Sequence, residues 1–272
     1  MIELERLWNY ATIKDNFIFS KTMEMYPDLC TRLLELILNV KIKEIDYPER
    51  EKTIETRIDG KGIRLDVYVK EEEEETNRSF DVEMQLSNSD NLAKRMRYYQ
   101  GLIDMDKLKR GQHYRELGES FVIFICTFEC FKQGRHIYTF QERCKQDHNL
   151  LLNDGATKVF LSTKGTVDDV PHDILAFLNY VDNGTVESKF VEELDNAVIA
   201  VKSNQKVRHD FMTFQMALLE KEIETEERVR NEEREAVATK LIRKGFSTAD
   251  ISEITDLPKE KIQQLVEINY GN

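Results

Sequence analysis

The chain has 272 residues, of which 40% are hydrophobic and 33% charged, and its formal net charge at pH 7 is −12. This length and apolar content suit one large domain with a smaller appendage, and they exclude a chain that is disordered throughout. The acidic balance excludes a protein that coats nucleic acid without sequence preference, because such a protein needs Lys and Arg over the phosphates.

Neither a membrane nor thiol chemistry is indicated. No apolar run approaches the ~20 residues that a membrane-spanning helix needs. The first residues include Glu3 and Glu5, where a secretory signal has a basic and then an apolar segment. The four cysteines and five histidines show no metal-ligand spacing, so we expect free thiols and no Cys or His nucleophile. We therefore expect a cytoplasmic protein without membrane contact.

The first part of the chain predicts helices followed by strands. Residues 1–40 have a helical pattern, with an apolar-rich segment at 29–38 that contains Glu35. Residues 41–59 alternate like a strand, and Asp-Gly-Lys-Gly at 59–62 is a strong hairpin signal. We expect an antiparallel meander of strands near 53–58, 63–69 and 80–86.

The central stretch, residues 63–86, carries the strongest pattern. Both of its ends alternate apolar and polar residues with period two, which is typical of strands with one buried face. Residues 70–79, between the two ends, are too polar to bury, and we expect them to form a solvated hairpin tip. If the two strands pair antiparallel, their polar side chains share one side of the sheet, and these are Asp66, Glu83 and Gln85.

Two carboxylates and an amide on one patch suit a specific chemistry. Carboxylate oxygens bind a hard cation such as Mg²⁺, which also takes phosphate oxygens of a substrate. The cation lowers the pKa of a water molecule and neutralises charge that develops on a phosphodiester. Gln85 projects from the same face and could orient that water. Two alternatives remain open: a solvated strand face is also rich in such residues, and Asp81 could serve in place of Glu83 if the strand register slips.

The next segment predicts a helix and then more strands. Ser89, Asp90 and Asn91 form a capping sequence for a helix over about 90–109. Arg95 lies beside the apolar stripe of this helix. It could steady the carboxylates or hold a phosphate, or it could simply pair with a surface acid. The stripe consists of Leu92, Met96, Tyr99 and Ile103.

A continuous apolar run at 121–128 is typical of a strand that is buried on both faces of a mixed sheet. Shorter strands are expected at 135–142 and 158–161. The α/β unit therefore ends near residue 165.

The last hundred residues are expected to be helical. Residues 205–244 lack Gly and Pro, and Glu alternates with Arg in 220–235, as in a solvated helix with too few apolar residues for a sustained heptad seam. Gly245 can end this helix, and Ser247 can cap the next one. We divide the chain into a core at 1–165, a helical extension with a charged linker helix at 166–235, and a helix-turn-helix-like module at 236–272. We expect a homo-oligomer that forms through the C-terminal helices, because acidic residues dilute the Lys and Gln that would read DNA.

The Asp on one strand and the Glu-x-Gln on the next resemble the core of the PD-(D/E)XK nuclease superfamily, in which Glu-x-Lys is usual. Gln85 in the Lys position is similar to one branch, the recombination-promoting nucleases or PD-(D/E)XK family transposases. Three further segments resemble motifs of that branch in the same order, within about residues 10–160. They are Asp-Asn-Phe-Ile-Phe at 15–19, Arg-Met-Arg-Tyr-Tyr at 95–99 and Leu-Lys-Arg-Gly-Gln-His-Tyr at 108–114.

The resemblance implies an α/β fold, a restriction-endonuclease-like mixed sheet flanked by helices with a helical C-terminal appendage. It also implies a Mg²⁺-dependent endodeoxyribonuclease that hydrolyses DNA phosphodiesters, linked to recombination, mobile elements or phage defence. Asp66 and Glu83 would hold Mg²⁺, Asp15 (or Glu35) would complete the ligand set, and Gln85 would position the water. The alternative is a catalytically weak or inactive nuclease-fold binding protein that is regulated through its C-terminal module. Gln85 and the acidic net charge favour this alternative.

Overall fold

The computed structural model describes residues 2–43, 45, 49–54, 63–72, 77–88 and 91–270. The chain divides into two compact units, Met1–Arg208 and His209–Asn272. The expected boundary near residue 165 coincides with the end of the last strand, and the helices that follow, up to residue 208, belong to the first unit.

The first unit is built on a mixed sheet whose strand order is β1-β2-β3-β4-β6-β5. The pairs β1–β2, β2–β3 and β5–β6 are antiparallel, whereas β4 is parallel to both β3 and β6. This confirms the expected α/β mixed sheet and the meander of its first three strands. The strands are β1 (Glu49–Ile54), β2 (Ile63–Glu72), β3 (Asn77–Gln85), β4 (Glu119–Cys126), β5 (Ile137–Phe140) and β6 (Ala156–Ser162). Most of the strand expected at 53–58 lies outside the described residues.

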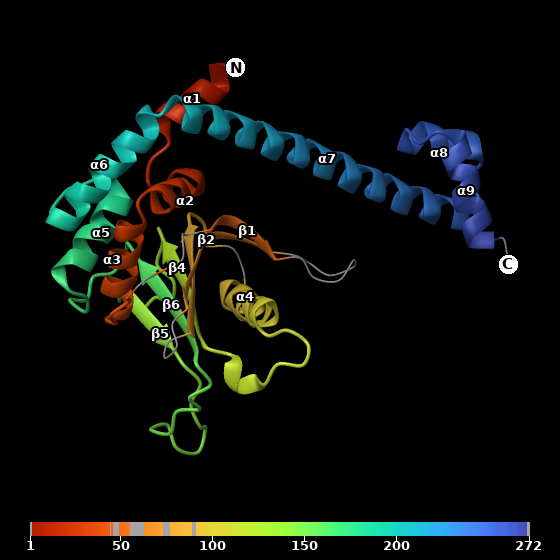
Figure 1. Ribbon diagram of the computed structural model, residues 1–272. Coiled ribbons are helices and arrows are strands. Elements are labelled where there is room, and N and C mark those ends of the chain that lie inside the picture. Colours follow the sequence, from red (N-terminus) through yellow and green to blue (C-terminus); the bar gives the residue numbers. More distant parts are fainter. Residues whose placement is uncertain are drawn as a thin grey trace. The chain divides into compact units, whose positions relative to one another are not determined.

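Helices cover both faces of this sheet, with α4 on one side and α3, α5 and α6 on the other (Figure 1). The helix α2 packs against α3 and α6 and contacts the strands β1, β2 and β3. The helices of this unit are α1 (Ile2–Tyr10), α2 (Asn16–Met25), α3 (Pro27–Leu38), α4 (Leu92–Lys107), the short 3-10 helix η1 (Tyr114–Glu116), α5 (His172–Asn183) and α6 (Lys189–Ser203).

The apolar stripe of α4 explains why this helix covers the sheet. Its buried side chains join a core with Tyr68 of β2 and with Val122 and Phe124 of β4. The residue before the helix, Asn91, has φ 76° and makes no side-chain capping hydrogen bond. The other two residues of the expected capping sequence lie outside the described residues. The stripe members Leu92, Met96 and Ile103 are buried, as the spacing predicts.

The structure excludes one open alternative for the central strands, a solvated polar face, and corrects one expectation, the solvated hairpin tip. The polar face of β2 and β3 is not exposed, because α4 covers it, and Asp66, Glu83 and Gln85 are 6%, 4% and 7% exposed. The polar segment between the strands does not consist only of a solvated tip. The strand β2 continues to Glu72, and Glu71 is fully buried. The expectation failed because alternation reports which residues are apolar, not what covers the opposite face.

The second unit contains most of α7 (Gln205–Arg243), with α8 (Thr248–Thr255) and α9 (Lys259–Tyr270). Gly245 follows α7 with φ 81°, and the Ser247 hydroxyl oxygen accepts a hydrogen bond from the Asp250 N–H at 3.2 Å, so both expected boundary signals are present. Within the described part of the chain, no helix is both long enough and apolar enough to cross a membrane. The small core of this unit consists of Ala238, Ile242, Ile251, Leu257, Ile262 and Leu265.

Candidate functional site

Three polar side chains of β2 and β3 form a hydrogen-bonded cluster under α4. The backbone N–H of Asp66 donates to Glu83 Oε1 at 3.2 Å, and the Gln85 amide Nε2 donates to Glu83 Oε2 at 3.2 Å. The backbone N–H of Met84 lies 3.4 Å from Asp66 Oδ2. The cluster forms because β2 and β3 are antiparallel and pair Val67 with Val82, so that the polar residues beside this pair share a face.

Arg95 on α4 brings positive charge to the cluster. Its Nη2 lies 3.4 Å from Glu83 Oε2, and its guanidinium lies over the Phe124 ring at 4.8 Å and the Tyr99 ring at 5.5 Å. Ring faces attract a guanidinium, so the two aromatic residues hold Arg95 in position. Its side chain stays 34% exposed. The side chain of Arg95 is therefore anchored to Glu83 and remains partly exposed, although its Nε is buried.

Asp81 lies two residues before Glu83 on the same face of β3, and it is fully buried. Among the described residues, neither of its carboxylate oxygens has a hydrogen-bond partner. Asp81 pairs with Tyr68 of β2 and with Val122 of β4, so its immediate strand neighbours supply no cation. The period-two spacing places Asp81 on the same face as Glu83 in any register. Sequence reasoning gave Asp81 a role only as a replacement for Glu83 after a register slip, and not beside it.

The electrostatics of the cluster are dominated by burial. Burial and the negative charge of Asp66 raise the pKa of Glu83 to about 8, although Arg95 acts in the opposite direction. Burial and the charges of Glu83 and Asp66 hold the pKa of Asp81 well above its usual range. Both effects have the same physical cause: a carboxylate that leaves water needs a nearby positive charge to stay ionised.

The donor set fits a hard divalent cation. Carboxylate oxygens are the ligands that Mg²⁺ prefers, and among the described residues both oxygens of the buried Asp81 lack a hydrogen-bond partner. In the part of the chain that the structure describes, no three Asp, Glu, His or Cys side chains stand in a ready-made metal-binding arrangement. Mg²⁺ commonly uses only one or two carboxylates and completes its shell with water and phosphate oxygens.

The two acids expected to complete the ligand set occupy other settings. Asp15 is the N-cap of α2, and its Oδ1 accepts from the backbone N–H groups of Phe17 at 2.9 Å and Ile18 at 3.3 Å. Glu35 of α3 accepts from the backbone N–H of Ile42 at 3.1 Å. Both carboxylates thus stabilise local backbone in the helical layer that contains α2 and α3. A metal-binding role for either residue stays a prediction.

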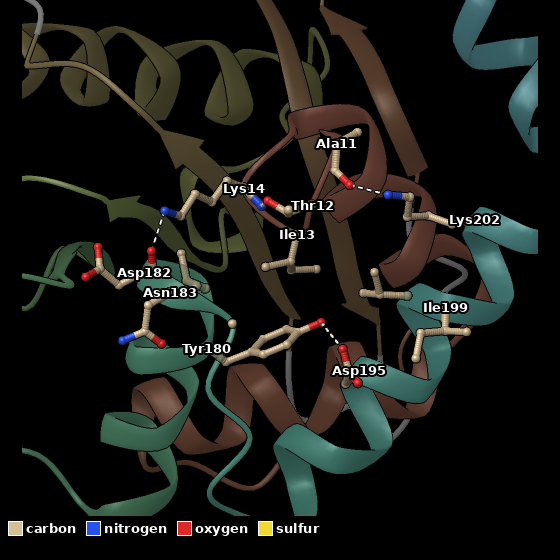
Figure 2. A pocket seen from close by; sticks show the side chains of 13 residues that line it. Ala11, Thr12, Ile13, Lys14, Tyr180, Asp182, Asn183, Asp195, Ile199 and Lys202 are labelled. Atoms are coloured by element: carbon tan, nitrogen blue, oxygen red, sulfur yellow. Dashed lines mark hydrogen bonds between the residues drawn. The ribbon is translucent and has the colours of Figure 1, made fainter. Parts of the chain in front are cut away.

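A pocket of about 400 Å³ lies between the segment 11–14, the end of α5 and the helix α6 (Figure 2). Its lysines are engaged with backbone carbonyl groups: Lys14 donates to Asp182 and Lys202 donates to Ala11. The Tyr180 hydroxyl donates to Asp195 Oδ1 at 2.9 Å. None of the pocket residues belongs to the carboxylate cluster, so the pocket is a separate feature of the first unit.

The mixed sheet, the helix across its acidic face and the Asp, Glu-x-Gln cluster define a nuclease-like α/β protein. The family model described as PD-(D/E)XK nuclease family transposase matches residues 17–167, which is more than half of the chain. The chain belongs to this family, as its motifs predicted. No curated protein and no solved structure matches the chain significantly. Membership indicates a nuclease- or transposase-related function and DNA binding, and nucleases of this superfamily generally use divalent metal ions.

Proposed function

We propose that the protein is a Mg²⁺-dependent endodeoxyribonuclease that hydrolyses DNA phosphodiesters. The observation that carries the proposal is the buried cluster of Asp66, Glu83 and Gln85 on neighbouring strands of a family nuclease fold. Three buried carboxylates, counting Asp81, act on one another electrostatically, and Arg95 contacts one of them, Glu83. A bound cation would offset the cost of ionising these acids, whose pKa values burial and mutual repulsion raise.

Asp66 and Glu83 would hold the cation. When bound, Mg²⁺ supplies positive charge that neutralises the phosphodiester, and it lowers the pKa of the attacking water. Gln85 orients that water, because its amide is anchored to Glu83 Oε2 through Nε2. An amide does not gain or lose a proton near neutral pH, so Gln85 acts by hydrogen bonding and not as a base.

Arg95 would act on the substrate phosphate. Its guanidinium is held over two aromatic rings, contacts Glu83 and remains partly exposed. A guanidinium offers several donors in a planar fork that suits a phosphate. Arg95 can therefore hold the scissile phosphate beside the carboxylates. Asp15 stays in the proposal as an additional ligand by family resemblance alone.

The test is nicking of supercoiled plasmid by the purified wild type and by Glu83→Ala, both verified as folded, with Mg²⁺ and then with Mn²⁺. We expect cleavage by the wild type and none by the variant. Equal cleavage by both proteins would place the activity elsewhere, in another site or a contaminant. No cleavage by either protein with either metal would favour the alternative, a nuclease-fold binding protein.

The variant Gln85→Lys introduces the lysine that is usual at this position in the superfamily motif Glu-x-Lys. Faster cleavage by this variant would show that the amide is a weakened substitute for lysine. Loss of cleavage would show that the amide has a role that an ammonium group cannot fill. Both outcomes are informative only if the wild type cuts DNA.

We also propose that the second unit mediates self-association of a cytoplasmic enzyme. Several apolar side chains of α7 are exposed, among them Leu218, Leu219 and Ile223 at 41%, 46% and 57%. Residues 236–272 would then act as a regulatory module, residues 166–235 as an extension and linker helix, and residues 1–165 as the catalytic core. Light scattering after size-exclusion chromatography measures the mass directly, and a monomer at all concentrations would contradict this proposal. Recombination, mobile elements and phage defence remain the settings that the family suggests.

A further inference from the structure

We infer that Asp81 is a third carboxylate ligand of the divalent cation, in addition to Asp66 and Glu83. The three carboxylates do not stand in a ready-made metal-binding arrangement in the described structure, so their side chains must rotate toward one another when the cation binds. This inference rests on the proposed function and adds a ligand that the Asp, Glu-x-Gln motif does not contain. It is carried by the position of Asp81 in the sheet and by its lack of any partner in the described structure.

The strand register places Asp81 within reach of the other two carboxylates. Asp81 and Glu83 are separated by one residue on β3 and therefore point to the same face. The register pairs Asp81 with Tyr68 of β2, so that Asp66, two residues earlier on β2, is its diagonal neighbour. Diagonal neighbours in an antiparallel pair lie about 7–8 Å apart and can still interact through their side chains. The negative charges of Glu83 and Asp66 both act on Asp81, which is consistent with this proximity.

The described surroundings of Asp81 offer its carboxylate oxygens no hydrogen-bond partner. Its neighbours across β2 and β4 are Tyr68 and Val122, and both are buried in the core under α4. Arg95 is the cation that acts on Asp81, but its Nη2 is engaged with Glu83. Its Nε is buried without a hydrogen-bond partner among the described residues, so it does not serve Asp81.

Glu71 shows what a neutralised buried acid looks like in the same sheet. It is as fully buried as Asp81, but it accepts hydrogen bonds from the Lys43 N–H at 3.1 Å and from Arg78 Nη1 at 3.3 Å. Among the described residues, one buried carboxylate thus has hydrogen-bond partners and the other has none. Burying a carboxylate without a partner is costly. A bound cation offsets that cost at Asp81, because oxygen ligands with negative charge are those that Mg²⁺ selects.

The experiment measures Mn²⁺ binding to the full-length protein by electron paramagnetic resonance, together with thermal unfolding without metal. The variants are Asp81→Asn, Glu83→Gln and the matched control Glu71→Gln, which changes a partnered buried acid. We expect Asp81→Asn to weaken Mn²⁺ binding about tenfold or more, in the range typical of losing a group that supports a metal site. We also expect it to raise the unfolding temperature of the metal-free protein, because it removes an unpartnered buried acid. Glu71→Gln should leave Mn²⁺ binding within about twofold and lower the unfolding temperature, because it weakens an existing pair.

The outcomes separate this inference from the proposed function. If Glu83→Gln loses Mn²⁺ and Asp81→Asn binds it like the wild type, the inference is overturned and the metal site stands. If the wild type binds no Mn²⁺, the proposed site itself fails, and the inference fails with it. An Asp81→Asn protein that is less stable than the wild type without metal also overturns the inference, because it would show that the carboxylate contributes to folding by itself.

Discussion

Both ends of the β2–β3 hairpin contain buried acids, but the two sets of acids differ in their hydrogen-bond and ion-pair partners. Near the turn, Glu71 receives hydrogen bonds from Arg78 and from the Lys43 backbone, and Arg78 Nε also donates to Glu119 at 3.0 Å. At the other end, Asp66, Asp81 and Glu83 gather near the partly exposed Arg95. At the first end Glu71 has a cationic partner, whereas at the second end both oxygens of Asp81 lack a hydrogen-bond partner among the described residues.

This difference separates an acid that has partners within the fold from the acids for which we propose a ligand. A protein gains nothing for its own stability by burying carboxylates next to one another, because burial and mutual repulsion both oppose ionisation. A group of buried acids with strongly raised pKa values is therefore a candidate functional site. The acids near the turn illustrate the ordinary solution, in which each buried charge has a partner.

The largest expected effect is on cleavage. Asp66→Asn should reduce the rate of plasmid cleavage by about 100-fold or more, because the charge stabilisation contributed by a metal ion amounts to several kcal/mol. Glu71→Gln should leave the rate of the folded protein within about twofold. Initial rates at saturating Mg²⁺ measure both. A comparable loss of cleavage rate in Glu71→Gln would contradict the proposal that only the acids at the Asp66 end take part in cleavage.

The next largest effect is on stability, and it concerns the end of the hairpin near the turn. Arg78→Met should lower the free energy of unfolding by about 3 to 5 kcal/mol, because it leaves Glu71 as an uncompensated buried charge. Denaturant titration of the metal-free protein measures this loss. Arg95→Met is the matched change at the acidic end, where the side chain is more exposed, and a smaller loss is expected. Equal losses would mean that Arg95 contributes as much to the free energy of unfolding as Arg78 does.

A third expectation concerns pH. Because burial raises the pKa of Glu83 to about 8, this carboxyl group is mostly protonated at pH 7 in the metal-free protein. A cation binds the ionised form, so binding must release a proton and must tighten as pH rises toward 8. One released proton corresponds to at most about tenfold in affinity per pH unit. Calorimetry in buffers of different ionisation enthalpy counts the protons, and a count of zero at pH 7 would contradict the raised pKa.

The smallest effect is expected in the second unit. Ile223→Lys should change the free energy of unfolding by no more than about 0.5 kcal/mol, because the side chain is exposed on α7. If exposed apolar residues of this helix mediate association, the same change should lower the oligomer mass in light scattering. An unchanged oligomer would move the association surface away from this part of α7.

Much of the fold could be predicted from local pattern. The apolar run at 121–128 became the buried strand β4, and the spacing of Leu92, Met96 and Ile103 became the buried side of α4. The helix boundaries predicted at Gly245 and Ser247 separate α7 from α8. These features depend on periodicity and on the conformational preferences of single residues, and both are properties of a short segment.

The candidate site could be predicted only in part. Period-two alternation and the family motifs identified Asp66, Glu83 and Gln85, whose common face follows from strand parity. What lies above that face was not predictable, because it depends on α4, which packs across the sheet from outside the hairpin. For the same reason the burial of Glu71 was missed, and Asp81 was regarded as a substitute for Glu83.

The sequence by itself determined the order of strands and helices, the family and the residues that share the acidic face. Each of these depends on neighbours along the chain or on motifs that can be read directly. Only the tertiary structure decided which buried acids have partners. Arg78 reaches Glu71, whereas Arg95 reaches Glu83 and leaves both oxygens of Asp81 without a hydrogen bond in the described part of the chain. The physical reason is that the ionisation of a buried carboxylate depends on charges a few ångströms away in space, and the fold alone brings those charges together.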